Sequence, residues 1–436
     1  MVETQSSVSI STKLARIAEI AKRKPGVALE TLAHHIDIDW LREAVRRTRK
    51  DGAAGVDGQT AAEYAEDLEA NLASLLDRAK SGLYRAPPVR RVWIPKADGR
   101  KLRPIGVPAY EDKVLQRAVA MVLEAVYEQD FLDCSYGFRP NRSAHEALEA
   151  LWSQLMEVGG GWVIELDIQD FFGSLDRGQL REVLRKRIRD GVLLRLIGKW
   201  LRAGVMEGQS VEYPEAGTPQ GGVISPILSN VFLHEVLDRW FERDVRPRMC
   251  GKAYLVRYAD DAVLVFECKE DAERVMAVLS QRFAKYSLTL HAEKTRMVAF
   301  GRPRHRAKRG PKGFTFLGFM HYWGRSRRGS WVVKKKTGSQ QRTRALRVIA
   351  QWCRSYRHLP VKLQWRSLAR KVRGHYAYYG ITGNMQALKS FRHEVERVWR
   401  KWLARRGARR AMPWERFARL LERYPLPPAV IVHRVS

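Results

Sequence analysis

Three acidic residues lie in two short apolar segments whose spacing could support metal-dependent chemistry. The segment LVRYADDAVLVFE, residues 255–267, carries Asp260 and Asp261 side by side, and the segment WVIELDI, residues 162–168, carries Asp167. Taken singly, each fits an ordinary turn or the polar face of a strand. Carboxylates that converge would repel one another unless cations neutralised them, and Mg²⁺ prefers such oxygen ligands. Two such ions can stabilise the attacking and leaving oxygens of a phosphoryl transfer.

Strands are the elements that must position these acids. Side chains alternate along a strand, so WVIELDI would bury Ile164 and its neighbours on one face and present Asp167, with Val163 and Glu165, on the other. The runs YLVRY and AVLVF on either side of the paired acids predict a β-hairpin with the acids at its turn. Two adjacent strands would therefore bring the three carboxylates to the mouth of one cleft.

Composition limits the partners that this chain could bind. The chain has 436 residues, a formal charge of +32 and an isoelectric point near 10.3, which indicate two or three domains and a polyanionic partner. Thirteen Trp and fifteen Tyr supply rings that could stack on bases. No segment is apolar enough for a signal peptide or a membrane span, and the four cysteines lack zinc or disulfide spacing. We therefore expect nucleic acid, no membrane and a cytoplasmic location.

The predicted elements change in character along the chain. Helices and short strands alternate up to about residue 325, and VRRVWIPKADGRKLRPIGVP, residues 89–108, predicts a second hairpin around Asp98-Gly99. From about residue 340 the chain reads as helical and rich in Arg and Trp. In RTRALRVIAQWCRSY the apolar residues follow helical spacing, and the arginines lie largely off that stripe, where phosphates could be bound.

Several motifs together resemble one known family. The segment RYADDAVLV resembles the Tyr-Ala-Asp-Asp signature of reverse transcriptases. Further segments resemble those of the bacterial group II intron reverse transcriptase/maturase family, of the type that lacks a nuclease domain, and they occur in its order. These segments are KLRPIGVP (101–108), YGFRPNRSAHEAL (136–148), ELDIQDFF (165–172), GTPQGGVISPILSNVFLHEVLD (217–238), LTLHAEKT (288–295), FTFLGF (314–319) and RGHYAYYGITGN (373–384).

The resemblance implies a fold and a domain order. The fold would be α+β, a right-hand polymerase whose fingers and palm carry a small antiparallel sheet, followed by an all-α thumb. We expect an N-terminal extension over residues 1–60, fingers and palm over 61–325, a thumb or maturase domain over 326–395, and a basic DNA-binding-like segment over 396–436.

The resemblance also implies a set of metal ligands. Asp167 and Asp260 would hold two Mg²⁺ ions directly, with the backbone carbonyl of Ile168, and Asp261 would be a supporting acid. Mn²⁺ could substitute for Mg²⁺. Phe172 would lie under the incoming sugar and leave no room for a 2′-hydroxyl, so that dNTPs are selected over rNTPs.

Other residues would contact the nucleotide. Lys96 and Arg103 would reach the triphosphate as a point charge and a bidentate fork. Gln220 would contact the nucleotide and template pair, and Gly221 would let the backbone approach the bases closely. Lys294 would protonate the leaving pyrophosphate.

Two positions beside the predicted site depart from the usual family pattern. Gly173 stands where the family often has Asp, and Ala262 stands where a Phe is common. Neither departure removes a metal ligand, so we expect any effect on rate and fidelity rather than on the reaction itself.

The resulting hypothesis is an RNA-directed DNA polymerase that copies its group II intron RNA and also assists splicing and mobility as a maturase. Its partners would be the intron RNA in a ribonucleoprotein, the template-primer RNA/DNA duplex, target DNA and dNTPs, in the bacterial cytoplasm. One alternative is a related reverse transcriptase recruited to host defence or DNA repair without a resident intron. Another is a non-catalytic splicing cofactor with a relic polymerase site.

Overall fold

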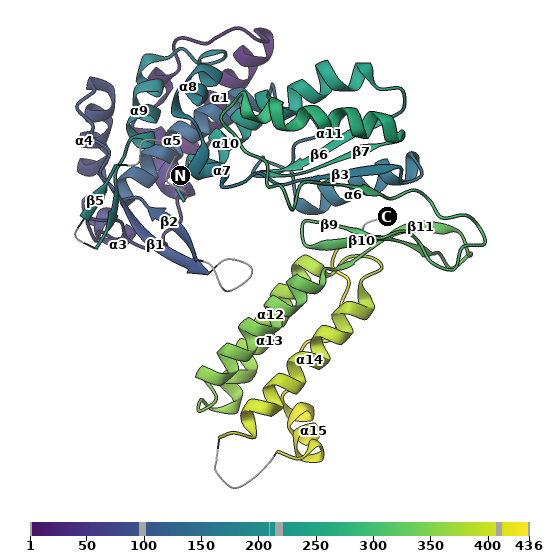
Figure 1. The fold of residues 1–436 in the computed structure, drawn as a ribbon. Coiled ribbons are helices and arrows are strands. Elements are labelled where there is room, and N and C mark those ends of the chain that lie inside the picture. The colour runs from purple at the N-terminus through teal and green to yellow at the C-terminus, as the bar shows by residue number, and fades with distance from the viewer. Residues whose placement is uncertain (1, 96–101, 209, 214–220, 407–411, 435–436) are drawn as a thin grey trace. The chain divides into compact units, whose positions relative to one another are not determined.

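The computed structural model describes residues 2–95, 102–208, 210–213, 221–406 and 412–434, with side chains from Ile10 onward. These residues form two compact units (Figure 1). Unit 1 contains the described residues of 2–95, 102–147 and 166–297. Unit 2 contains those of 148–165 and 298–434.

The first part of unit 1 is helical. Its helices are α1 (Val2–Arg23), α2 (Ile38–Arg47), α3 (Ala61–Glu66), α4 (Leu68–Ser81) and α5 (Tyr110–Tyr127). Helix α5 is apolar on most of its surface and is buried along most of its length, which makes it the central helix of this layer. Helix α2 begins at an Asp37 cap and packs against α5, where the Trp40 indole donates a hydrogen bond to the Ala118 carbonyl at 3.0 Å.

A small mixed sheet follows in unit 1. Strands β1 (Val89–Pro95) and β2 (Leu102–Val107) pair antiparallel, which confirms the two strands of the predicted hairpin. The turn expected at Asp98-Gly99 lies outside the described residues. Strands β4 (Val205–Glu207) and β5 (Ser210–Glu212) complete the order β2-β1-β4-β5, with β1 and β4 parallel.

The remainder of unit 1 carries the acidic hairpin. Strands β6 (Ala253–Tyr258) and β7 (Asp261–Phe266) pair antiparallel, as predicted, and α11 (Lys269–Ala284) follows them. Unit 1 also contains the helices α7 (Phe171–Ser174), α8 (Arg177–Arg185), α9 (Gly191–Leu201) and α10 (Ser225–Leu233). Helix α10 continues into two π-helical turns, His234–Asp238 and Phe241–Val245, and such turns often occur at functional sites.

Three elements run across the boundary between the units: α6 (Ala144–Glu157), β3 (Trp162–Leu166) and β8 (Arg296–Ala299). The polar face predicted for β3 is wrong in one respect, because Val163 is fully buried, as is Ile164. Glu165 on the same face accepts a hydrogen bond from the Thr315 amide at 3.0 Å. Strand β3 therefore has covered side chains on both faces, as strands in the interior of a sheet do.

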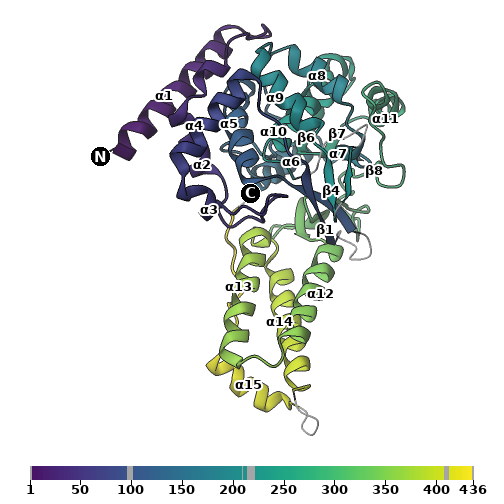
Figure 2. The same ribbon diagram turned by 90° about the vertical axis from the view of Figure 1, so that its left-hand side faces the viewer.

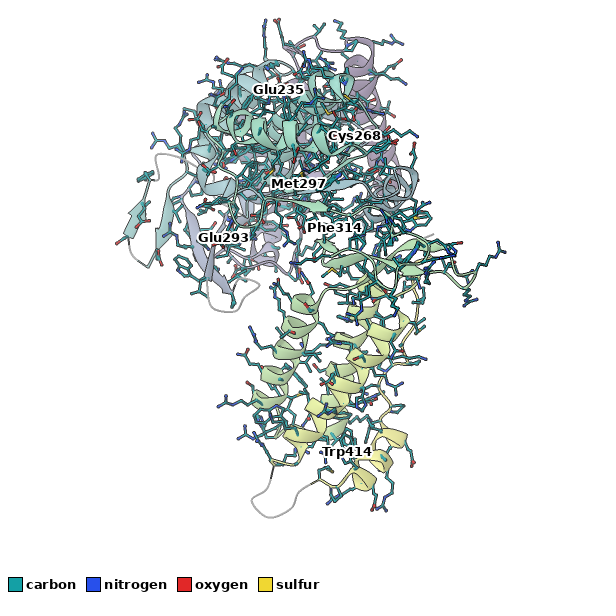
Figure 3. All side chains as sticks on the ribbon, turned by 45° about the vertical axis from the view of Figure 1, so that its right-hand side comes forward. Glu235, Cys268, Glu293, Met297, Phe314 and Trp414 are labelled. Carbon is teal, nitrogen blue, oxygen red and sulfur yellow. The ribbon has the colours of Figure 1, made fainter. Side chains whose placement is uncertain are left out.

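Unit 2 contains a three-stranded antiparallel sheet and a helical bundle. The sheet has the order β11-β10-β9, formed by β9 (Phe314–Phe316), β10 (Phe319–Arg325) and β11 (Trp331–Thr337). Helices α12 (Ser339–Ser355), α13 (Val361–Tyr379) and α14 (Met385–Leu403) lie side by side (Figure 2), and α15 (Trp414–Arg423) follows. Trp414 lies at the end of the bundle away from Phe314 (Figure 3).

The core of the bundle comes from apolar residues at helical spacing. Ile349, Leu368 and Trp399, from three different helices, are almost completely buried together. The Trp399 indole donates to the Gln364 side-chain oxygen at 3.0 Å, which satisfies a buried polar pair. The helical character expected from about residue 340 is thus confirmed. Within the described part of the chain, no helix is both long and apolar enough to cross a membrane.

Candidate active site

Asp260 and Asp261 stand at the turn of the β6–β7 hairpin. Tyr258 pairs with Asp261, so the turn itself consists of Ala259 and Asp260. Ala259 has a positive φ of 57°, which fits the first central position of a type II′ turn, where glycine is usual. The local sequence therefore predicts the hairpin, but a non-glycine residue holds its most demanding backbone position.

Asp167 immediately follows β3, which ends at Leu166, whereas the sequence predicted that Asp167 would lie within the strand. Its backbone carbonyl accepts hydrogen bonds from the His291 amide at 2.8 Å and the Thr295 hydroxyl at 3.2 Å. Ile168 is buried and forms an isolated antiparallel bridge with Leu290. The segment LTLHAEKT therefore lies beside Asp167 and fixes its backbone.

Lys294 comes from that same segment and contacts the Asp167 carboxylate directly. Its Nζ lies 3.1 Å from both carboxylate oxygens of Asp167. The side chains are 58% and 30% exposed, so the ion pair is open to solvent. The sequence motif places the lysine near the site, but the pairing itself comes from the tertiary structure.

The three acids influence one another electrostatically. Partial removal from water, followed by the charges of Asp260 and Asp167, raises the pKa of Asp261 to about 6, while Lys294 and Arg103 oppose that rise. Asp261 as a whole residue is nevertheless exposed. The negative charge gathered here is what a bound cation would neutralise.

The donor set suits a hard divalent cation, because carboxylate oxygens are the preferred ligands of Mg²⁺. Among the described residues, however, no group of three or more His, Cys, Asp and Glu has the arrangement of a metal site. The Lys294 ammonium group contacts both oxygens of Asp167, one of the predicted ligands, at 3.1 Å.

Besides Lys294 and Phe172, the structure describes Arg103 and Gly221 among the residues predicted to contact the nucleotide. Arg103 lies on β2 opposite Ile94 and is exposed. Its positive charge acts to lower the pKa of Asp261. Gly221 has a φ of 117°, and a Cβ there would lie 2.6 Å from Ile105 and 2.7 Å from the Gly106 carbonyl. Only glycine allows this close approach to β2. Lys96 and Gln220 lie outside the described residues.

Phe172, Gly173 and Ala262 lie close in the sequence to the predicted acids, the first two after Asp167 and the third directly after Asp261. Phe172, in α7, is partly buried, and its ring meets Phe171 edge to face at 5.2 Å. A Cβ at Gly173 would lie 2.1 Å from a carboxylate oxygen of Asp170, so the Asp170 side chain occupies that space. Ala262 is buried in β7.

A second feature of unit 1, which we did not predict, is an arginine-lined pocket between α8 and α9. Its volume is about 840 Å³. The arginines that line it are Arg177, Arg181, Arg185, Arg189, Arg195 and Arg202. Among the described lining residues the single acid is Glu182, which pairs with Arg185 at 3.1 Å. The spacing of four between Arg177, Arg181 and Arg185 was the signal in the sequence, since such residues share one helix face.

Comparison with known proteins defines the class. Residues 94–321 match the family described as "Reverse transcriptase (RNA-dependent DNA polymerase)". This match covers more than half of the chain. The acidic hairpin and the Lys294 segment both lie within it. The fold agrees at the coarser level of a mixed α/β protein with small sheets whose strand pairs are mostly antiparallel.

Individual relatives narrow the class further. The chain is 34% identical over 363 residues to Protein YkfC of Escherichia coli (strain K12), covering 74% of this chain and 91% of that protein. It is 40% identical over 169 residues to the Group II intron-encoded protein LtrA of Lactococcus lactis subsp. cremoris, covering 38% of this chain but 28% of LtrA. It is 27% identical over 369 residues to the Putative COX1/OXI3 intron 2 protein of Saccharomyces cerevisiae, covering 72% and 40%. The chain belongs to the group II intron reverse transcriptase/maturase family, as the motifs predicted.

Proposed function

We propose that this protein is an RNA-directed DNA polymerase that copies group II intron RNA and also acts as a maturase on that RNA. The observation that carries the proposal is that Asp167 and Asp260 lie close enough to Asp261 for their charges to add to the effect of burial, which together raise the pKa of Asp261 to about 6. A primer 3′-hydroxyl would attack the α-phosphate of a dNTP, and pyrophosphate would leave. Positioning and charge neutralisation dominate such a transfer.

We assign roles to the chain's own residues as follows. Asp167, Asp260 and Asp261 would hold two Mg²⁺ ions, together with the carbonyl of Ile168, and Mn²⁺ would be a substitute. When bound, these ions supply charge stabilisation at the attacking and leaving oxygens. Phe172 would exclude a ribose 2′-hydroxyl.

The nucleotide contacts follow from the same proposal. Arg103 would bind the triphosphate, together with Lys96. Gln220 and Gly221 would line the nucleotide and template pair. Lys294 would leave Asp167 when the cation binds and donate a proton to pyrophosphate.

The domain assignment belongs to the same proposal. We propose fingers and palm over 61–325, a thumb or maturase domain over 326–395 and a DNA-binding-like segment over 396–436, after an N-terminal extension over 1–60. The arginine-lined pocket of α8 and α9 supports contact with a phosphate backbone, because six arginines and one acid are among the residues that line it. We place part of the intron RNA contact at this pocket, and template-primer duplex, target DNA and dNTPs are the other partners.

The proposed location is the bacterial cytoplasm. All four cysteines are free thiols, which suits that compartment.

Primer extension on an RNA template tests the polymerase assignment. Asp260→Asn keeps the shape of the side chain but removes its charge, so extension should fall by at least roughly 100-fold, the size of a lost electrostatic contact in a transition state. Asp77→Asn is the matched control, since Asp77 is exposed on α4, away from the site residues in the sequence. Binding of the RNA, measured by filter retention, should be unchanged in both variants. Extension by Asp260→Asn at the wild-type rate would contradict the assignment.

The two alternatives give different outcomes. A non-catalytic splicing cofactor would bind and assist intron RNA, but the wild-type protein would not extend primers. A reverse transcriptase without a resident intron would extend primers with no preference for intron RNA. Its gene would also lack a flanking group II ribozyme.

A further inference from the structure

Arg257 of β6 lies completely buried two residues before the strained Ala259. Its Nε and one Nη donate to the two oxygens of Asp238, at 2.7 and 2.6 Å, and both side chains are 0% exposed. The other donors reach Asn230 at 3.0 Å, Ser135 at 2.7 Å and the backbone carbonyl of Ala259 at 2.9 Å. All five N–H groups of the guanidinium therefore have acceptors.

A buried ion pair of this kind is a poor device for stability alone. Removing two charges from water costs several kcal/mol, and well-packed apolar residues are often as stable in the same place. Burial favours the neutral carboxyl, but the charge and hydrogen bonds of Arg257 lower the pKa of Asp238, so the pair is ionised at neutral pH. A function in specifying geometry would account for such a pair better than a function in stability.

The geometry that this ion pair would specify is that of the Ala259–Asp260 turn between β6 and β7. Ala259 has a φ of 57° without being glycine, and such a conformation persists only where its surroundings hold it in place. Arg257 provides a direct restraint, because it donates to the Ala259 carbonyl, which belongs to the peptide bond that leads into Asp260.

The loop of residues 134–137 supports the turn from a second side. The Arg257 amide donates to the Cys134 carbonyl at 2.7 Å, and the Tyr136 amide donates to the Arg257 carbonyl at 2.9 Å. A Cβ at Gly137 would lie 2.3 Å from the Ala259 amide nitrogen, so this loop backbone rests directly against the turn. Asn230, which already binds Arg257, donates to the Gly137 carbonyl at 2.7 Å. The guanidinium thus joins α10, the loop and the turn.

We propose that the Arg257–Asp238 pair is a positioning device that fixes the Ala259–Asp260 turn and so sets where Asp260 and Asp261 meet Asp167. This inference rests on the proposed polymerase function. Arg257 touches none of the reacting groups itself, so its effect passes through the backbone of the turn. Its loss should lower the rate of the chemical step and raise the Mg²⁺ concentration needed for half-maximal rate.

The decisive variant removes the pair without leaving a buried charge. The double replacement Arg257→Met with Asp238→Leu leaves an apolar pair, which should keep the fold stable. We expect kcat to fall by roughly 100-fold, the effect of a misplacement of about 1 Å in a site. The KM for dNTP should change much less. Arg257→Lys with Asp238 intact should recover part of the rate, because it keeps the charge but cannot make all five contacts.

Two further variants separate positioning from folding. Arg187→Lys is the matched control, because Arg187 is also buried and binds Asp130 and backbone carbonyls such as that of Ala21, none of which belongs to the turn. It should lower the thermal midpoint without changing kcat of the folded protein. Gly137→Ala should lower kcat with Arg257 in place, because the added methyl group displaces the turn.

Amide hydrogen exchange over residues 258–262 gives a readout that does not depend on activity. The double variant should exchange faster at these amides than the wild type does, with the exchange of α5 unchanged. A stable double variant with wild-type kcat and unchanged exchange at the turn would overturn the inference. If the wild type does not extend primers, the polymerase proposal fails by itself, and the exchange result alone still decides whether Arg257 holds the turn.

Discussion

Replacement of Lys294 by methionine tests two roles of one side chain. The ammonium group contacts both oxygens of Asp167 at 3.1 Å. A cation that binds Asp167 must first displace it. If the same lysine donates a proton to pyrophosphate, its removal also slows the chemical step. The two roles predict changes of different parameters, so one variant can separate them.

The magnitude of the first effect follows from exposure. The Lys294 and Asp167 side chains are 58% and 30% exposed, and an exposed ion pair contributes at most about 1 kcal/mol. Release of that pair should therefore tighten the apparent Mg²⁺ affinity by no more than about fivefold. Loss of a general acid should lower the rate at saturating Mg²⁺ by roughly 100-fold or more.

Single-turnover primer extension over a series of Mg²⁺ concentrations measures both parameters. Lys285→Met is the control for loss of surface charge, because Lys285 is an exposed lysine at the end of α11. If Lys294→Met needs more Mg²⁺ than the wild type, Lys294 does not compete with the cation and our interpretation of its contact is wrong. If the rate at saturating Mg²⁺ is unchanged, Lys294 is not the proton donor.

Three further predictions concern other parts of the chain. Phe172→Val should reduce the preference for dNTP over rNTP by at least roughly tenfold, a value typical of one removed steric contact, and competitive incorporation measures this ratio. His321 is fully buried, and burial lowers its pKa to about 3. The unfolded state therefore binds more protons between pH 6.5 and 3, and stability is lost as the pH falls through that range, by about 1.4 kcal/mol per unit. His321→Phe should shift acid unfolding, followed by circular dichroism, to lower pH, and an unchanged midpoint would contradict this account. Arg181→Gln combined with Arg185→Gln should weaken RNA binding and reduce the slope of log K against log salt by up to about 1.5, if each arginine contacts one phosphate. The exposed Arg243→Gln serves as its control, and an equal loss in that variant would show that only net charge matters.

The sequence by itself determined the local elements and the family. The β6–β7 hairpin could be predicted because β-favouring runs flank a short turn, and this information lies within residues 253–266. The helices of the C-terminal region could be predicted because apolar residues recur at helical spacing. Motif order alone was sufficient to identify the reverse transcriptase family. The roles assigned to individual site residues remain predictions.

Only the tertiary structure decided which charged groups meet. Lys294 lies 127 residues from Asp167 in the sequence, and the arginine-lined pocket requires two helices to pack. In the sequence, Arg257 is a single charged residue within an apolar strand. The structure alone shows that it pairs with Asp238. Local propensity extends over a few residues, whereas ion pairing and pKa shifts depend on distance and on exclusion of water, which packing sets.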